Sequence, residues 1–366
     1  MGNYSQFLKL KTTSGLHSPS VSEIKALGID IKVDSCFLCN PYAFDLFMEY
    51  FNQSELSEYV KYYPPQNTIL AKEFSEALNL PPEYVFLGNG AIQIIELILR
   101  EYYSFSKCIV TPTFSTYYEY DEQNILFFKT HKEENFKINV DELIKFSREN
   151  SVKMLALVNP NNPTGSTLLK SEIMKIVASL DDSIVLVDES FIDFFDVNNS
   201  VEKEVGKWNN LIVLRSMSKD FGIAGLRLGY SVLNPSLRQK LFEKYGLLWN
   251  INGLAHFFIQ IIKEKNFKKR YFEAREIYLE GRNIFRNDLK KLREIKVYPS
   301  QSNFFLVERK ENINEVFSKL LFEYGIYTRI LNDKRDLDDS FIRVACGKIE
   351  ENDYIYQSLK KIFTVK

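Results

Sequence analysis

One lysine lies among polar and cationic residues in the segment RSMSKDFGIAGLRLGY. Lys219 follows a short apolar run, with Ser216 and Ser218 close before it and Arg227 after it. Burial at the end of such a run and a neighbouring cation both lower the pKa of an amine, and a lysine of this kind becomes nucleophilic near neutral pH. The segment predicts a lysine that bonds to a carbonyl group; the alternative is an ordinary surface lysine beside a serine-rich turn.

An aspartate ends a second apolar run, SIVLVD. Asp188 would bury its carboxylate there, which costs free energy unless a cation meets it. The protonated pyridine nitrogen of pyridoxal phosphate is such a cation, and an Asp that keeps this nitrogen protonated makes the ring an electron sink. Asp188 and Lys219 together therefore predict a pyridoxal 5'-phosphate site, whereas Asp188 alone would also suit the cap of the next helix.

Two loops carry groups that suit the rest of this cofactor. GNGA, residues 88–91, opens the helical pattern IQIIELILREYY, and glycines at a helix N-terminus let backbone N–H groups approach a phosphate closely. Gln93 occupies the third glycine position of a dinucleotide fingerprint, which argues against that alternative. In NPNNPTG, residues 159–165, Asn162 could donate its side-chain amide to the ring phenolate, although the same loop also suits a rigid turn.

Helical and strand patterns alternate along most of the chain. Several short strands, such as MLALV and SIVLV, are apolar along their whole length, which is typical of a parallel sheet covered by helices on both faces. Active sites of such sheets gather at the carboxyl ends of the strands, where each motif above lies. We predict an α/β fold with a mostly parallel central sheet in residues 41–255, and a smaller α+β domain built from residues 1–40 and 256–366.

Composition and charge argue against several classes of protein. Lys and Arg number 47 against 48 Asp and Glu, so the chain lacks the basic excess of a nucleic-acid binder. No run approaches the ~18 apolar residues of a membrane helix, and the N-terminus lacks the apolar core of a secretory signal, so we expect a cytoplasmic protein. Cys36 and Cys39 form one CxxC pair with no second pair, and no metal site is expected.

The motifs GNGA, NPNNPTG, VDESFIDFF and SMSKDFGIAGLRLGY resemble, in order and separation, the class I/II pyridoxal-phosphate-dependent aminotransferases of fold type I. The resemblance runs from CFLCNPYAF to SFIRVACGK and includes two branches, the histidinol-phosphate aminotransferases and the threonine-phosphate decarboxylases. It implies that Lys219 bonds to the cofactor, Asp188 pairs with its pyridine nitrogen and Asn162 binds its phenolate. By the same resemblance, the residues at the cofactor phosphate and ring are Gly90, Ala91, Ser216, Ser218, Arg227 and Phe114.

The resemblance also implies contacts with the substrate and with a second subunit. Tyr63, in KYYPPQN, matches a tyrosine that reaches the neighbouring subunit's cofactor, which implies a homodimer with shared active sites. Asn40 and His17 match residues near the substrate. Arg343 matches an arginine that binds the substrate's anionic group, and Arg329 matches a second one. Two guanidinium groups suit a dianion better than one carboxylate, so we expect a phosphorylated substrate; the alternative for Arg329 is a solvated strand residue.

Local segments point to two different reactions. DESFIDF, with Phe191 where many aminotransferases have tyrosine, resembles the decarboxylase branch, as do the segments around His17 and Trp249. KDFGIAG, at the lysine, resembles the aminotransferase branch. We predict an aminotransferase that moves an amino group from glutamate to a small phosphorylated ketone or aldehyde, of the dihydroxyacetone phosphate or imidazole-acetol phosphate type. The alternative is a decarboxylase of phosphoserine or phosphothreonine.

A further alternative is a protein that binds the cofactor without catalysis, as a regulator does. Such regulators usually carry an added nucleic-acid-binding segment. The sequence leaves no room for one before MGNYSQFLK or after KKIFTVK, so we expect an enzyme.

Overall fold

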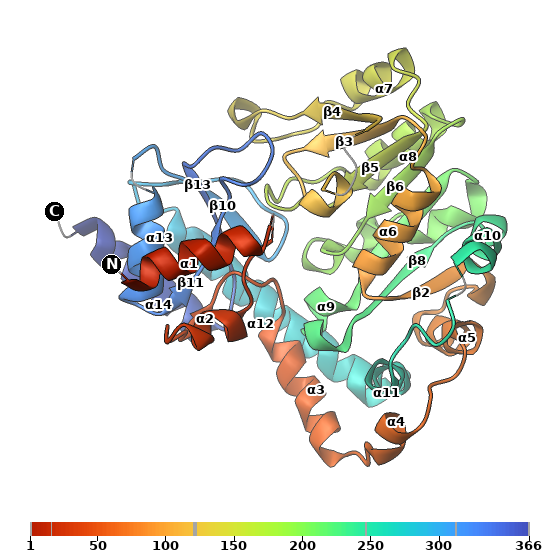
Figure 1. The fold of residues 1–366 in the computed structure, drawn as a ribbon, viewed down its shortest axis with the longest axis horizontal. Coiled ribbons are helices and arrows are strands. Elements are labelled where there is room, and N and C mark those ends of the chain that lie inside the picture. Colours follow the sequence, from red (N-terminus) through yellow and green to blue (C-terminus); the bar gives the residue numbers. More distant parts are fainter. Residues whose placement is uncertain (1, 16, 120–122, 246, 312, 365–366) are drawn as a thin grey trace.

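A seven-stranded sheet forms the centre of the larger part of the molecule (Figure 1). The computed structural model describes residues 2–15, 17–119, 123–245, 247–311 and 313–364. The strand order is β2-β8-β7-β6-β5-β3-β4; β8 is antiparallel to β2 and β7, and the other neighbouring strands of this sheet pair in parallel. This confirms the predicted, mostly parallel sheet. Its strands are β2 (Val85–Asn89), β3 (Lys107–Thr111), β4 (Ile125–Lys129), β5 (Met154–Val158), β6 (Ile184–Asp188), β7 (Leu211–Ser216) and β8 (Leu228–Val232).

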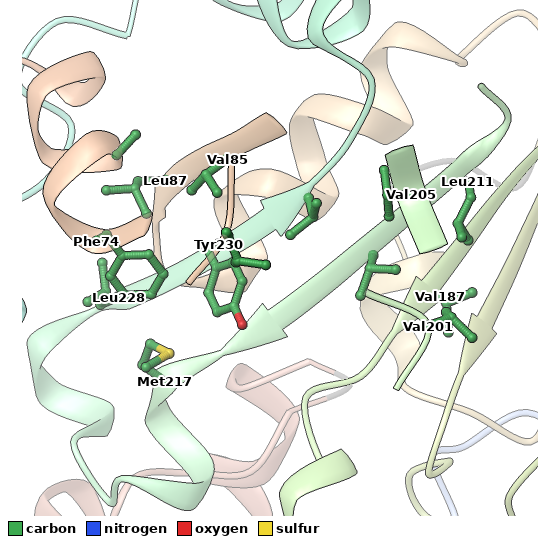
Figure 2. Close-up of a cluster of buried hydrophobic side chains, with 14 of the residues drawn as sticks. Phe74, Val85, Leu87, Val187, Val201, Val205, Leu211, Met217, Leu228 and Tyr230 are labelled. Atoms are coloured by element: carbon green, nitrogen blue, oxygen red, sulfur yellow. The ribbon is translucent and has the colours of Figure 1, made fainter. Parts of the chain in front are cut away.

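Helices cover both faces of this sheet, which explains why its strands are apolar along their whole length. Along β6, Val185 and Val187 belong to one buried cluster and Leu186 to another, because successive side chains of a strand point to opposite faces. Figure 2 shows part of the first cluster, where Phe74 packs near strand residues such as Leu87. The helices that contribute to the first cluster include α5 (Asn67–Leu78), α7 (Val140–Glu149), α8 (Lys170–Ser179) and α11 (Gly253–Ile261); α6 (Ala91–Glu101) and α10 (Pro235–Tyr245) contribute to the second cluster.

A smaller part contains an antiparallel sheet in the order β12-β13-β10-β9 and the parallel pair β1-β11. Residues from both ends of the chain share its core: Phe7 and Ile24 are buried in one cluster with Leu320 and Ile355. Figure 1 shows the N-terminal helix beside the C-terminal ones. The elements are α1 (Gly2–Thr13), α2 (Val21–Ala26), β1 (Val33–Asp34), β9 (Lys296–Val297), β10 (Phe304–Glu308), α13 (Ile313–Phe322), β11 (Ile326–Tyr327), β12 (Arg329–Ile330), β13 (Phe341–Ala345) and α14 (Ile349–Thr364).

One long helix, α12 (Lys265–Leu289), joins the two parts. Its Phe267 packs in the core of the seven-stranded sheet, and its Phe285 packs in the core of the smaller sheet. Helices α3 (Pro41–Gln53) and α4 (Ser57–Lys61) precede α5. Because α12 contributes to both cores, it fixes the small sheet against the carboxyl ends of the central strands. The boundary between residues 255 and 256 stays a prediction.

The described residues include neither a membrane-spanning helix nor a metal-binding group of side chains. No helix there is long and apolar enough to cross a membrane. Nor do three or more His, Cys, Asp or Glu side chains of the described ranges come together in a group that could hold a metal ion.

Candidate active site

A pocket lies at the carboxyl ends of β5, β6 and β7, where a parallel sheet places its active site. Eight of the ten residues predicted to contact the cofactor line it together. They are Ala91, Phe114, Asn162, Asp188, Ser216, Ser218, Lys219 and Arg227. The chain thus brings residues from five separate segments to one place.

Lys219 lies in α9 (Met217–Asp220), directly after β7, and its side chain faces the pocket. Burial lowers the pKa of Lys219; Cys39 opposes this shift, whereas the guanidinium groups of Arg343 and Arg227 add to it. The Nζ atom lies 5.9 Å from the centre of the Phe191 ring. A neutral amine in an apolar wall is the form that attacks a carbonyl carbon, so the environment suits the predicted bond to the cofactor.

Asp188 ends β6 with its carboxylate buried below the pocket. The Ser190 backbone N–H donates to Oδ1 at 2.9 Å, and the Tyr117 hydroxyl donates to Oδ2 at 2.9 Å. Burial nevertheless raises the pKa of Asp188, which the bonds from Ser190 and Tyr117 and the charge of Lys219 oppose only in part. The carboxylate therefore needs a further cation, and a protonated pyridine nitrogen would supply it.

The N-terminus of α6 and Arg227 form one wall of the pocket. Gly90 precedes α6 with φ 76°, and a Cβ atom there would lie 2.3 Å from Arg227 Nη2. Only glycine therefore lets the guanidinium approach the free N–H groups that begin this helix. Ser216 and Ser218 contribute hydroxyl groups beside them. A guanidinium, hydroxyls and a helix N-terminus together suit a phosphate.

Gln93, at the third glycine position of the dinucleotide fingerprint, makes hydrogen bonds that a glycine could not make. Its Oε1 accepts the Asn89 backbone N–H at 2.8 Å and the Asn250 amide at 3.0 Å. The side chain thus fastens the start of α6 to the preceding strand. A glycine at this position would leave both donors without that partner.

Asn162 and Arg343 connect the pocket to the small sheet. Arg343 Nη1 donates to Asn162 Oδ1 at 2.6 Å, and its Nη2 donates to the Cys36 carbonyl at 2.6 Å. A guanidinium can only donate, so the amide oxygen of Asn162 must face it and the Nδ2 donor is turned elsewhere. This orientation fits the predicted hydrogen bond from Asn162 to the ring phenolate.

Asn40 lies against the lysine loop. Its backbone N–H donates to the Lys219 carbonyl at 2.8 Å, and a Cβ atom at Gly222, where φ is 69°, would lie 2.3 Å from the Asn40 carbonyl. Its Oδ1 caps α3, whereas its buried Nδ2 has no hydrogen-bond partner among the described residues. A buried donor without a partner at this place fits an acceptor atom of a ligand.

The other predicted substrate residues, Arg329 and His17, are not among the residues that line the pocket. Arg329 lies opposite Arg343 in the β12–β13 register and pairs with Asp333 at 2.6 Å. Both arginines are buried, so the alternative of a solvated strand residue at Arg329 is wrong. His17 lies 2.9 Å from Glu119 and its ring centre is 6.0 Å from that of Phe114, a residue of the pocket wall.

Tyr63 is the predicted cofactor residue that lies apart from the pocket. Its side chain is 79% exposed and stacks on Trp249 with the ring centres 4.6 Å apart. A tyrosine that serves a neighbouring subunit must be exposed in its own subunit. The position is therefore compatible with the predicted role, which stays a prediction.

Two residues beside the site, Tyr117 and Lys334, were not predicted from the sequence. Tyr117 bonds to Asp188, and Lys334 donates from its Nζ to Ser115 Oγ at 2.7 Å. Tyr117 could have been found from its position three residues after Phe114. Lys334 could not, because only the fold brings the loop after β12 to the segment after β3.

The residues of the pocket fit pyridoxal phosphate. Arg227, the two serines and the start of α6 would hold the phosphate, Asp188 would hold the pyridine nitrogen, and Asn162 the phenolate. Phe114 forms part of the wall against which the ring would stack. Lys219 is the amine within the pocket that would bond to the aldehyde. The phosphate, the pyridine nitrogen, the phenolate and the aldehyde of the cofactor would thus each meet a residue of suitable charge or hydrogen-bonding capacity.

Known proteins similar to this chain carry two names. The model of the family "Aminotransferase class I and II" matches residues 48–359. An L-serine phosphate decarboxylase from Campylobacter jejuni is 36% identical and aligns over 99% of this chain and 97% of its own. A histidinol-phosphate aminotransferase from Clostridium novyi is 33% identical over 83% of each chain. The solved structure of a decarboxylase from Sulfurospirillum multivorans superposes with a TM-score of 0.91, at 34% identity, over 98% of this chain and 95% of its own.

These comparisons overturn the predicted amino transfer from glutamate and favour its alternative, decarboxylation. The two decarboxylases are 34–36% identical over 98–99% of this chain, whereas the histidinol-phosphate aminotransferase aligns over 83% of it. The error has a physical cause: KDFGIAG carries the lysine, and both reactions need that lysine in the same place. The predicted cofactor, pyridoxal phosphate, and the predicted family are confirmed. The chain belongs to the class I and II aminotransferase family.

Proposed function

We propose that this protein is a pyridoxal-phosphate-dependent decarboxylase that converts O-phospho-L-serine to O-phosphoethanolamine and carbon dioxide. The similarity to an L-serine phosphate decarboxylase over 99% of the chain carries this proposal. Two buried arginines beside the pocket, Arg329 and Arg343, support a substrate with a phosphate group. The residues of the pocket support the cofactor.

The reaction requires one bond to break and one proton to be delivered. When bound, the cofactor supplies an electron sink that withdraws the electron pair of the bond between the α-carbon and the carboxylate. Carbon dioxide leaves without that pair, and the α-carbon then takes one proton. Lys219 Nζ is the group of the pocket placed to deliver it. One proton is consumed for each carbon dioxide released, so no acceptor for an amino group takes part.

The first experiment incubates the cofactor-loaded protein with O-phospho-L-serine alone. We expect carbon dioxide and O-phosphoethanolamine in equal amounts, with no keto acid added. Parallel incubations use L-serine, which lacks the phosphate, and O-phospho-L-threonine, which adds a methyl group. Release of no carbon dioxide from either phosphorylated substrate would refute the proposed decarboxylase.

Tyr63 supports a homodimer in which each subunit completes the partner's site. In its own subunit, the side chain is exposed and held by stacking on Trp249, so its hydroxyl is available to a second chain. We propose that this hydroxyl contacts the cofactor of the partner subunit. A cytoplasmic location likewise stays a proposal.

Mixing two impaired variants tests the shared site. Tyr63→Ala is expected to lower kcat roughly 10- to 100-fold, as for the loss of a hydrogen bond to a charged group, and Lys219→Ala to be inactive. In a hybrid dimer, one site receives both Lys219 and Tyr63. After denaturation and refolding of an equal mixture, about a quarter of the wild-type activity should therefore appear, since half the dimers are hybrids with one intact site. No gain over the separate variants would contradict the shared site.

A further inference from the structure

The helix that carries Lys219, α9, is a single turn of four residues. One turn fixes several backbone dihedral angles and gains few hydrogen bonds in return, so a helix this short depends on contacts with its surroundings. The Ser216 side chain accepts the Ser218 backbone N–H at 3.3 Å, and the Asn40 backbone N–H donates to the Lys219 carbonyl at 2.8 Å. These two contacts hold the start of the turn and the side of it that faces Asn40.

Lys219 and the residue that follows it face different spaces. Lys219 lines the cofactor pocket, whereas Asp220 lines a second cavity of about 580 Å³, which Asp193 and Tyr271 also line. We call this second space the rear cavity. Ser216 lines both spaces, so the turn forms a wall between them. Because protein interiors are otherwise close-packed, a wall beside a cavity has fewer packing contacts to restrain it on that side.

Tyr271, on α12, contacts the turn from the side of the rear cavity (Figure 1). Its hydroxyl donates to Asp220 Oδ2 at 2.7 Å, and its ring stacks on that of Phe221 with the ring centres 4.3 Å apart and the planes at 21°. Both Tyr271 and Asp220 are buried. Since α12 packs in the cores of both sheets, this hydrogen bond ties the neighbour of Lys219 to an element that is fixed at both ends.

The carboxyl group of Asp220 is buried at a cost. Burial and the charge of Asp193 raise its pKa, and the hydrogen bond from Tyr271 and the charge of Arg215 oppose this shift. Asp193 itself pairs with Arg215 at 2.5 Å. An apolar pair of the same shape as Tyr271 and Asp220 would avoid the cost of burying a carboxyl near a like charge. The pair is therefore a poor choice for stability alone, which favours a role in placing the turn.

We propose that Tyr271 is a positioning residue: through its hydrogen bond to Asp220, it holds the turn so that the Lys219 amine stays buried in the cofactor pocket. Without this bond, the turn would relax toward the rear cavity and the amine would become better hydrated. This inference rests on the proposed role of Lys219. It does not rest on the choice of reaction, because amino transfer and decarboxylation both use that lysine.

The test replaces Tyr271 by Phe, which removes the hydroxyl and keeps the ring that stacks on Phe221. The pKa of Lys219 is measured in the cofactor-free full chain, from the rate at which trace acetic anhydride acetylates it across a pH series, read by peptide mass. The groups whose charges act on this amine are Cys39, Arg343, Arg227 and Asp188. The substitution leaves all four in place.

Tyr271→Phe should raise the pKa of Lys219 toward its ordinary value, because burial is the main cause that lowers it. The fraction of neutral amine at neutral pH should therefore fall roughly 3- to 10-fold. In the cofactor-loaded variant, kcat for phosphoserine should fall by a similar factor, with a smaller change in KM.

Two substitutions at Asp220 separate the hydrogen bond from the charge. Asp220→Asn keeps an oxygen that can accept from the Tyr271 hydroxyl, so its fraction of neutral Lys219 should stay within about 1.5-fold of the wild type. Asp220→Ala should match Tyr271→Phe, and combining the two should add little, because each removes the same bond. Equal changes in Asp220→Asn and Asp220→Ala would assign the effect to the charge and overturn the role of Tyr271.

Tyr230→Phe is the matched control. Tyr230 is also buried, lines the rear cavity and donates to Glu202 Oε2 at 2.6 Å, but it lies on β8, outside the turn. Both Phe variants lose a hydrogen bond to a buried carboxylate, so both should lower the melting temperature by a few degrees. Only Tyr271→Phe should change the pKa of Lys219.

The amine measurement also separates this inference from the proposed reaction. If phosphoserine releases no carbon dioxide but the pKa of Lys219 changes as expected, the proposed reaction fails and the role of Tyr271 stands. An unchanged pKa of Lys219 in Tyr271→Phe, or an equal change in Tyr230→Phe, would overturn that role. Should Tyr271→Phe fold poorly, the comparison of Asp220→Ala with Asp220→Asn decides in the same way.

Discussion

The Lys219→Ala protein is expected to decarboxylate phosphoserine at least about 10⁴-fold more slowly than the wild type. General acid–base groups contribute 10²- to 10⁴-fold on their own, and this lysine is also the residue that we propose bonds to the cofactor. Burial lowers the pKa of the Lys219 amine, which lies in the pocket with Asn162 and Asp188. Among the described residues that line the pocket, Lys219 is the one lysine. Turnover is followed by carbon dioxide release, and the bond by peptide mass after borohydride reduction.

Lys175→Ala is the control for this substitution. Lys175 is half exposed on α8 and pairs with Asp141 at 2.6 Å, so its loss should leave both activity and the borohydride adduct unchanged. Burial lowers the pKa of Lys219 in the folded state, which means that folding disfavours its charged form. Removing it should therefore not reduce the free energy of unfolding at neutral pH. An adduct of normal yield in Lys219→Ala, on another residue, would contradict the assignment.

Much of the fold was predictable because local patterns and the global topology agree. The strand ending at Asp188 is apolar on both faces, and helices do cover both faces. Helix α5 spans Asn67–Leu78, and it ends where Asn79 adopts a left-handed conformation shortly before Pro81 and Pro82, two local signals that the sequence carries. Motifs at strand ends were expected to meet, and they do, since the carboxyl ends of parallel strands share one edge of the sheet.

The remainder depended on contacts between distant segments. The bond between Lys334 and Ser115 joins residues 219 positions apart, and that between Arg343 and Asn162 joins residues 181 apart. Neither residue pair has a spacing that the sequence could reveal. The choice of reaction was missed for a similar reason: it depends on which bond of the substrate stands perpendicular to the cofactor ring, and the lysine motif does not determine that angle.

Replacing Asp188 by Asn is expected to lower kcat roughly 10²- to 10³-fold with a much smaller change in the KM for phosphoserine. The substitution is nearly isosteric. Its amide can still accept from the Ser190 N–H and can donate to the Tyr117 hydroxyl, so the pocket should keep its shape while it loses one negative charge. Asp188 ends β6 below the ring site, whereas the predicted substrate residues Arg329 and Arg343 lie on β12 and β13, so substrate affinity should change little.

Two further variants identify the charge as the cause of this loss. Asp141→Asn, at the exposed partner of Lys175, should retain wild-type kcat. Asp188→Ala should recover part of its lost kcat when loaded with a cofactor analogue methylated at the ring nitrogen, because that nitrogen then stays positive without a carboxylate to hold its proton. A kcat in Asp188→Asn within threefold of the wild type would show that the buried carboxylate does not act on the ring. The raised pKa of Asp188 argues against that outcome. Burial of this carboxylate costs free energy, and a nearby positive charge, such as a protonated ring nitrogen, would offset that cost.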